Sequence, residues 1–206
     1  VVGGVVVLTD LNPIAVPQHF LLSMVILAAA VVLQRRALLL DGERWVPAVS
    51  RPTMRLLWAL AALAGVALVT GSVVTGSGPH SGMHKGEPVQ RFDLAISSAA
   101  RVHSISVLVL LALALFIVWR VRGTADRERI ESALGTFLFL GFVQGMIGYI
   151  QYFNDVPVVL VAIHVGLATS LWLSLVYLLV STRQVVRVSG SPSGEAGEAT
   201  AHVVEL

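Results

Sequence analysis

Three histidines lie inside strongly apolar stretches of the chain, where an ionisable side chain is costly. They are His19, His103 and His164, and each falls within about two helical turns of the same end of its stretch. An ionisable residue in lipid usually serves a function. The plain alternative is a neutral histidine that is hydrogen-bonded to a neighbouring helix. Three histidines at matching depth favour a shared chemical role.

The other residue types restrict what that role can be. The chain has no cysteine, which excludes disulfides, thiolate metal sites and cysteine nucleophiles. With few carboxylates in the apolar stretches, a zinc or two-metal site lacks ligands. Neutral imidazole suits heme iron, and two histidines from different helices of one bundle can hold a heme between them. We therefore pair His103 with His164 and assign His19 to a second unit, whose other ligand would lie upstream.

Further polar and small residues accompany these histidines. Gly141, Gly145 and Gly148 fall four and three residues apart on one helical face, which indicates either close helix packing or clearance for a flat macrocycle. Gln144 and Gln151 share that helix and can hydrogen-bond inside a bundle.

Residues near the water interface allow two interpretations each. Arg101 precedes His103 by two residues and either pairs with heme propionates or extends to the interface as an ordinary arginine. His80, His84 and Lys85 lie in a Gly/Ser-rich loop. The loop either caps the outer mouth of the bundle and binds propionates, or is an exposed polar loop, which is the interpretation we favour. It is not interpreted as a copper site.

The elements that carry these residues are apolar helices. The chain is 56% hydrophobic and 13% charged, with a mean hydropathy of +0.83, values too apolar for a soluble domain. About 20 apolar residues span a bilayer as a helix. Stretches of this kind occupy residues 16–33, 56–74, 98–119, 133–152 and 158–180. The sequence therefore predicts an all-α integral membrane protein.

Basic residues predict the orientation of these spans. One set of loops holds eleven arginines, and the opposite set holds only Lys85 and Arg91. The arginine-rich side should be cytoplasmic, which makes this charge an orientation signal rather than a nucleic-acid site. In a cell membrane, the loops at Asn12, His80 and Asn154 would then face outward.

A repeat indicates how the spans are grouped. A glycine, an Asn/Pro turn and a histidine recur as Gly4–Pro13–His19 and Gly148–Pro157–His164. We expect a duplicated bundle. Residues 1–36 would end an incomplete first half that begins inside a helix, and 37–55 would form a cytoplasmic loop. Residues 56–182 would form a complete four-helix half, and 183–206 a disordered cytoplasmic tail that includes His202.

In combination, several motifs resemble the heme A synthase family. They are LTDLNP at 8–13, HFLLS at 19–23, TGSGPHSG at 75–82, RVHS at 101–104, QGMIGYIQY at 144–152 and Ile163-His164. The resemblance covers almost all of residues 1–180. Asp10 and Met83 depart from the family pattern, and the cysteine pair that some members carry in the loop after Thr75 is absent.

The resemblance implies an activity and a set of roles. The family oxidises the C8 methyl of heme O to a formyl group, which makes heme A for terminal oxidases. It implies a b-type heme between His103 and His164, and it implies that His19 lies at the substrate-heme site. Catalytic residues would lie in an upstream part, so the chain alone is expected to be inactive. Heme O synthase and an electron-transfer protein are the implied partners.

Two other classes of function stay open at this point. A bis-histidine cytochrome b for electron transfer needs only His103 and His164. A transporter, or an assembly protein without a cofactor, needs neither histidine as a ligand.

Overall fold

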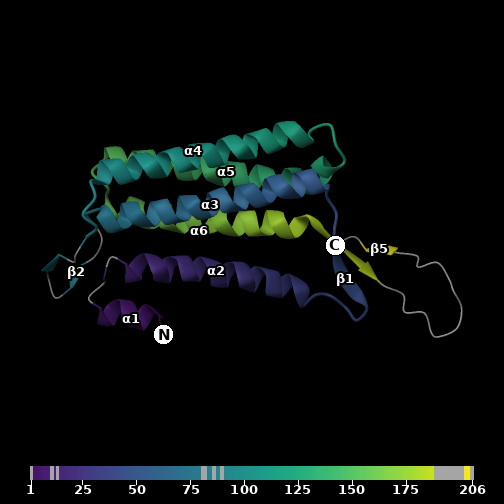
Figure 1. Ribbon diagram of the computed structural model, residues 1–206, viewed down its shortest axis with the longest axis horizontal. Helices are drawn as coiled ribbons and strands as arrows, with labels where there is room; N and C mark the ends of the chain where they lie inside the picture. The colour runs from purple at the N-terminus through teal and green to yellow at the C-terminus, as the bar shows by residue number, and fades with distance from the viewer. Residues whose placement is uncertain are drawn as a thin grey trace, which may run out of the picture.

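Helices make up most of the chain. The computed structural model describes residues 2–9, 12, 14–79, 83–84, 87–88, 91–187 and 202–204. Within these residues the helices are α1 (Val2–Leu8), α2 (Ala15–Arg36), α3 (Arg51–Ser77), α4 (Ile96–Val121), α5 (Asp126–Phe153) and α6 (Val158–Ser181) (Figure 1). Five of them, α2 to α6, are long and apolar enough to cross a membrane. The five predicted spans are confirmed, and the chain is a multi-pass membrane protein.

Two helices begin earlier than the sequence predicts. α3 starts at Arg51, so the end of the expected loop 37–55 is helical, and α5 starts at Asp126, inside an expected charged loop. Local chemistry explains both starts. The Ser50 side chain caps α3 by accepting from the backbone N–H of Thr53, and Pro52 lies in its first turn. Asp126 and Glu128 place negative charge in the first turn of α5, where the helix dipole favours it.

Helices α3 to α6 pack around a common axis. α3 contacts α4, α4 contacts α5, α5 contacts α6, and α6 contacts α3, so α4 and α6 face each other diagonally. α2 packs along α6 and α3, and the short α1 lies on α2 (Figure 1). The Trp172 indole on α6 donates a hydrogen bond of 2.9 Å to the backbone carbonyl of Met24 on α2. This bond fixes α2 against the four-helix group.

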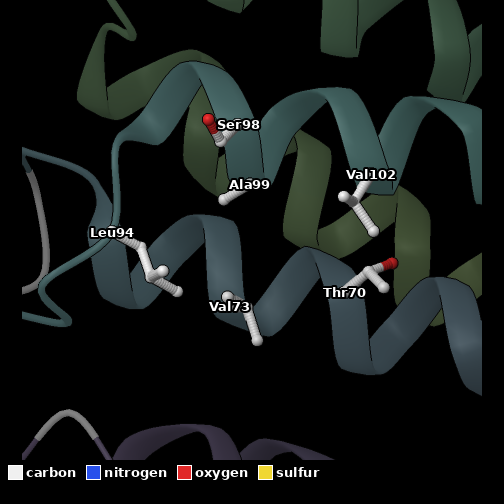
Figure 2. A pocket seen from close by; sticks show the side chains of 6 residues that line it. All are labelled: Thr70, Val73, Leu94, Ser98, Ala99 and Val102. Carbon is white, nitrogen blue, oxygen red and sulfur yellow. The ribbon is translucent and has the colours of Figure 1, made fainter.

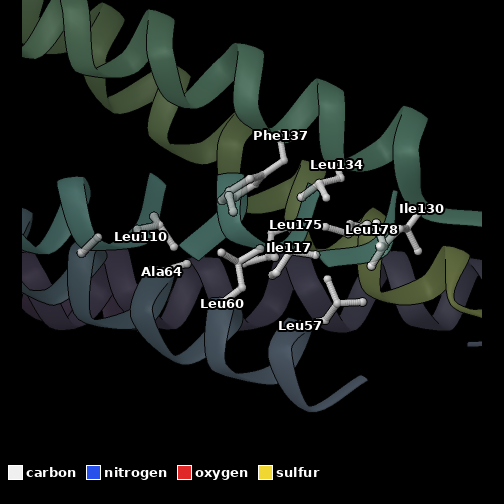
Figure 3. Packing of buried hydrophobic residues seen from close by; sticks show 13 residues of the cluster. Leu57, Leu60, Ala64, Leu110, Ile117, Ile130, Leu134, Phe137, Leu175 and Leu178 are labelled. Atoms are coloured by element: carbon white, nitrogen blue, oxygen red, sulfur yellow. The ribbon is translucent and has the colours of Figure 1, made fainter. Parts of the chain in front are cut away.

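The apolar core fills only one end of these four helices. Figure 3 shows residues such as Leu60 of α3, Ile117 of α4, Phe137 of α5 and Leu178 of α6 packed together, and all four are fully buried. We call this the sheet end, because a small β-sheet lies beyond it. The opposite end comprises residues 68–77, 96–109, 141–153 and 158–170, and we call it the histidine end.

A small sheet accompanies the helices, and part of it lies where the sequence predicts a disordered tail. β1 (Glu43–Pro47), β4 (Arg183–Arg187) and β5 (His202–Val204) pair antiparallel in the order β1-β4-β5. Residues from 183 were expected to be disordered, yet β4 continues almost directly from α6, and His202 lies in β5. Val185 and Val186 are buried β-branched residues, which suit a strand. Residues 188–201 and 205–206 lie outside the described part.

A second, minimal sheet lies in the loop between α3 and α4. β2 (Met83–His84) pairs antiparallel with β3 (Glu87–Pro88). His84 is therefore in β2, whereas His80 and Lys85 lie outside the described residues.

Candidate heme site

His103 and His164 meet inside the histidine end of the four helices. His103 projects from α4 and His164 from α6, the two helices that face each other diagonally. Their ring centroids are 6.5 Å apart, and the ring planes make an angle of 81°. The structure thus brings the two predicted ligands together in the interior of the bundle.

Each of the two imidazoles lies against a glycine of the preceding helix. A Cβ added to Gly71 of α3 would lie 3.0 Å from Cε1 of His103, and a Cβ added to Gly148 of α5 would lie 3.0 Å from Cε1 of His164. Any larger residue at either position would push the ring aside. These glycines therefore provide the space in which the imidazoles lie.

The three glycines of α5 have three different surroundings. A Cβ on Gly141 would come within 2.6 Å of Leu111, so this glycine serves close packing of α5 on α4. Gly145 faces open space, and Gly148 faces His164. The packing interpretation therefore holds for Gly141, and the clearance interpretation fits Gly148.

Hydroxyl groups surround the His103 ring. Thr70 Oγ1 lies 3.1 Å from His103 Nδ1, and it also donates to the Val66 carbonyl at 2.9 Å. Ser106 Oγ is 3.1 Å from the Thr70 oxygen and donates to the His103 carbonyl at 2.7 Å. One edge of the His103 imidazole is therefore held by α3.

The surroundings of His164 are less complete. Gln144 Nε2 donates a hydrogen bond of 2.9 Å to the His164 carbonyl. This side chain therefore hydrogen-bonds inside the bundle, as the sequence predicts. His164 Nδ1, Gln144 Oε1 and Gln151 Oε1 are buried and have no partner within the described part of the chain. Buried polar atoms without partners usually mark a missing water, ion or ligand.

The histidine end also lacks large buried side chains. Among its described residues, the buried ones are Ser72, Gly76, Ala99, Gly141 and Gln144, all small or polar. Native interiors are otherwise closely packed. A pocket of about 240 Å³ opens here between α3 and α4, lined by Thr70, Val73, Leu94, Ser98, Ala99 and Val102 (Figure 2). Thr70 lines this pocket, whereas neither imidazole does.

The other predicted site residues lie apart from the ring pair. His19 is exposed on α2 and lies against α1, where a Cβ on Gly3 would be 3.3 Å from its Cε1. Arg101 is exposed on the first turns of α4. Gly3 precedes His19 by sixteen residues (3 to 19), and Gly148 precedes His164 by the same interval (148 to 164). In both places the glycine faces the imidazole.

The donor set of this end fits a heme. Among the described residues, no three histidine or carboxylate side chains gather as ligands for a metal ion. Heme iron needs only two axial ligands from the protein. The two imidazoles, with ring centroids 6.5 Å apart, are the side chains at this end that could hold such an iron.

Comparisons with known proteins do not extend this description. No protein-family model, no curated protein and no solved structure matches the chain.

Sequence reasoning missed Thr70, Gly71 and Ser106 as neighbours of His103. Gly71 precedes His103 by 32 residues across a long loop, and its pairing with His103 is visible only once α3 and α4 are packed. The adjacent Thr70-Gly71 pair inside an apolar span was the available signal.

Proposed function

We propose that this chain is a heme-binding membrane protein in which His103 and His164 would hold one b-type heme. The observation that carries the proposal is the ring pair, with centroids 6.5 Å apart inside the histidine end. The glycine facing each ring and the scarcity of large buried side chains around the pair support it.

The activity to which we propose this chain contributes is that of heme A synthase, the oxidation of the C8 methyl of heme O to a formyl group. The motifs shared with that family support this choice over a simple cytochrome. Bound heme iron would supply the redox chemistry that protein side chains lack. His103 and His164 would hold the heme, and the surrounding apolar spans would exclude water. Arg101, two residues before His103 near the helix start, is the proposed partner of the propionates.

His19 is proposed to lie at the substrate site for heme O. Its helix pair repeats the arrangement of α5 and α6, with a glycine sixteen residues earlier (3 to 19 and 148 to 164) against the imidazole. This repetition supports a duplicated bundle, in which His19 occupies the place that His164 has in the four-helix group. The proposed orientation has the α5–α6 turn outside and the sheet end in the cytoplasm.

Extraction of the heme from the purified protein tests this proposal. The protein is produced in membranes that contain heme b and heme O, and its hemes are separated and identified by their pyridine hemochrome spectra. We expect heme b together with heme O. His19→Ala should lower the heme O content and leave heme b unchanged.

Three results would each contradict a stated part of the proposal. Protein without any heme would point to a transporter or an assembly protein. Heme b alone, unchanged in His19→Ala, would point to a bis-histidine cytochrome for electron transfer. Loss of heme b in His19→Ala would contradict the separate roles of the two sites.

A further inference from the structure

The hydrogen bonds around His103 indicate which nitrogen of its ring carries the proton. Thr70 has a single O–H, and the hydroxyl oxygen lies 2.9 Å from the Val66 carbonyl and 3.1 Å from the Ala67 carbonyl in the same helix. The Ser106 O–H is directed to the His103 carbonyl at 2.7 Å. With both hydroxyl protons bound to carbonyls, the Thr70 oxygen is left to accept. The group that lies 3.1 Å away and can donate to it is Nδ1–H of His103.

We propose that Thr70 is a positioning residue for the heme ligand His103. Its oxygen accepts from Nδ1–H, which leaves Nε2 with the free lone pair and fixes the ring about its long axis. Gly71, the next residue of α3, leaves room for the adjacent Cε1. The inference rests on the proposed heme site, but it concerns a residue outside the ligand pair.

The same contacts make the two ligands unequal. His103 is held by a hydroxyl group of α3, whereas His164 Nδ1 has no partner in the described part of the chain. An acceptor on the outer N–H makes an imidazole a stronger donor to metal and holds its orientation, and losing it typically weakens metal binding by about 10- to 100-fold. The Thr70 contact should therefore stabilise ferric heme and slow its release.

The test compares Thr70→Val, which removes the hydroxyl at nearly constant shape, with Thr70→Ser, which keeps it. Thr136→Val is the matched control, because the Thr136 hydroxyl bonds only to the Ser132 carbonyl of its own helix. Two quantities are measured on the heme-loaded protein, the rate of heme transfer to apomyoglobin and the midpoint potential. Thr70→Val should lose heme roughly tenfold faster or more and have a higher midpoint potential. Thr70→Ser and Thr136→Val should match the unaltered protein.

The outcomes separate this inference from the proposed function. If heme binds and Thr70→Val behaves like Thr136→Val, Thr70 does not position the ligand, although the heme site stands. If the unaltered protein binds no heme, the proposed function fails first. If Thr70→Val does not accumulate, ¹⁵N-histidine labelling of the ferrous unaltered protein decides. Two ligated imidazoles with unlike Nδ1 shifts support the inference, and identical shifts overturn it.

Discussion

At the scale of single residues, two glycines determine how the imidazoles lie. Gly71 and Gly148 face the Cε1 atoms of His103 and His164, and a Cβ at either position would be 3.0 Å away. That distance is shorter than ordinary van der Waals contact, so the ring would have to move by a few tenths of an ångström. His103 and His164 project from α4 and α6, which face each other diagonally. A shift of either ring therefore changes the distance and angle between the two imidazoles and a ligand that they share.

Alanine at these glycines should therefore affect heme binding more than folding. We expect Gly71→Ala and Gly148→Ala to weaken heme retention and alter the low-spin signal in electron paramagnetic resonance. Gly65→Ala and Gly135→Ala are the controls, because a Cβ there meets nothing within 4 Å. Alanine favours a helix over glycine by about 1 kcal/mol, so the controls should keep heme and be at least as stable. Equal heme loss in all four variants would contradict this role.

At the scale of elements, a buried carboxylate connects the first turns of α3 and α5. Asp126 accepts hydrogen bonds from the backbone N–H of Ser50 at 3.0 Å, from its hydroxyl at 2.6 Å and from the Thr53 hydroxyl at 2.5 Å. Ser50 also caps α3. One side chain thus fixes where two spans begin and how they sit relative to each other.

Removal of that charge should loosen the sheet end. In Asp126→Asn, one accepting oxygen is replaced by an NH₂ group, which faces donors from Ser50 and Thr53 and cannot accept from them. Each hydrogen bond to a charged group contributes about 2 kcal/mol to stability, and the variant loses this contribution. We expect Asp126→Asn to unfold at a clearly lower temperature than the unaltered protein, measured by the loss of its helical circular dichroism signal. Glu128→Gln, an exposed change in the same turn, is the control. Equal melting temperatures for the two variants would show that the Asp126 contacts do not stabilise the bundle.

The elements also show what the sequence could and could not predict. Five spans followed from hydropathy, because a lipid-exposed helix must be apolar along its whole length. The sequence does not predict the early starts of α3 and α5, because charged residues there also suit a loop, although Ser50 and Asp126 are typical of helix starts. The strand Arg183–Arg187 was missed because its partner, Glu43–Pro47, lies some 140 residues earlier (187 minus 43 is 144).

The candidate site, like the fold, could be predicted only in part from the sequence. His103 and His164 could be paired from sequence, because they share depth and belong to one set of spans, and their rings are adjacent in the structure. Thr70 and Gly71 could not be assigned to His103, because the rotation of α3 about its own axis decides which residues face α4. That rotation follows from packing of the core at the sheet end rather than from local sequence.

At the scale of the whole molecule, charge and packing are both asymmetric along the bundle axis. The sheet end has the apolar core and most of the arginines, such as Arg35 over the Tyr177 ring and Arg36 over the Trp45 ring. The histidine end has small and polar buried residues. We expect the first end in the cytoplasm and the second near the outer face.

Cysteine labelling tests this orientation directly, because the chain has no cysteine of its own. Asn154→Cys in the α5–α6 turn and Gly123→Cys between α4 and α5 are both exposed positions. A thiol reagent that does not cross membranes should label Asn154→Cys in intact cells, and Gly123→Cys only after permeabilisation. The reverse pattern would place the histidine end inside and contradict the proposed orientation.

The central claim is that His103 and His164 together hold one heme, and the absorption spectrum of histidine variants tests it most directly. The reduced, purified protein should have the sharp bands of a low-spin b-type heme. His103→Ala and His164→Ala should each abolish that low-spin signal, whereas His19→Ala, the same change on α2, should keep it. If the signal persists in both His103→Ala and His164→Ala, the two imidazoles are not the ligands, and the account of this site is wrong.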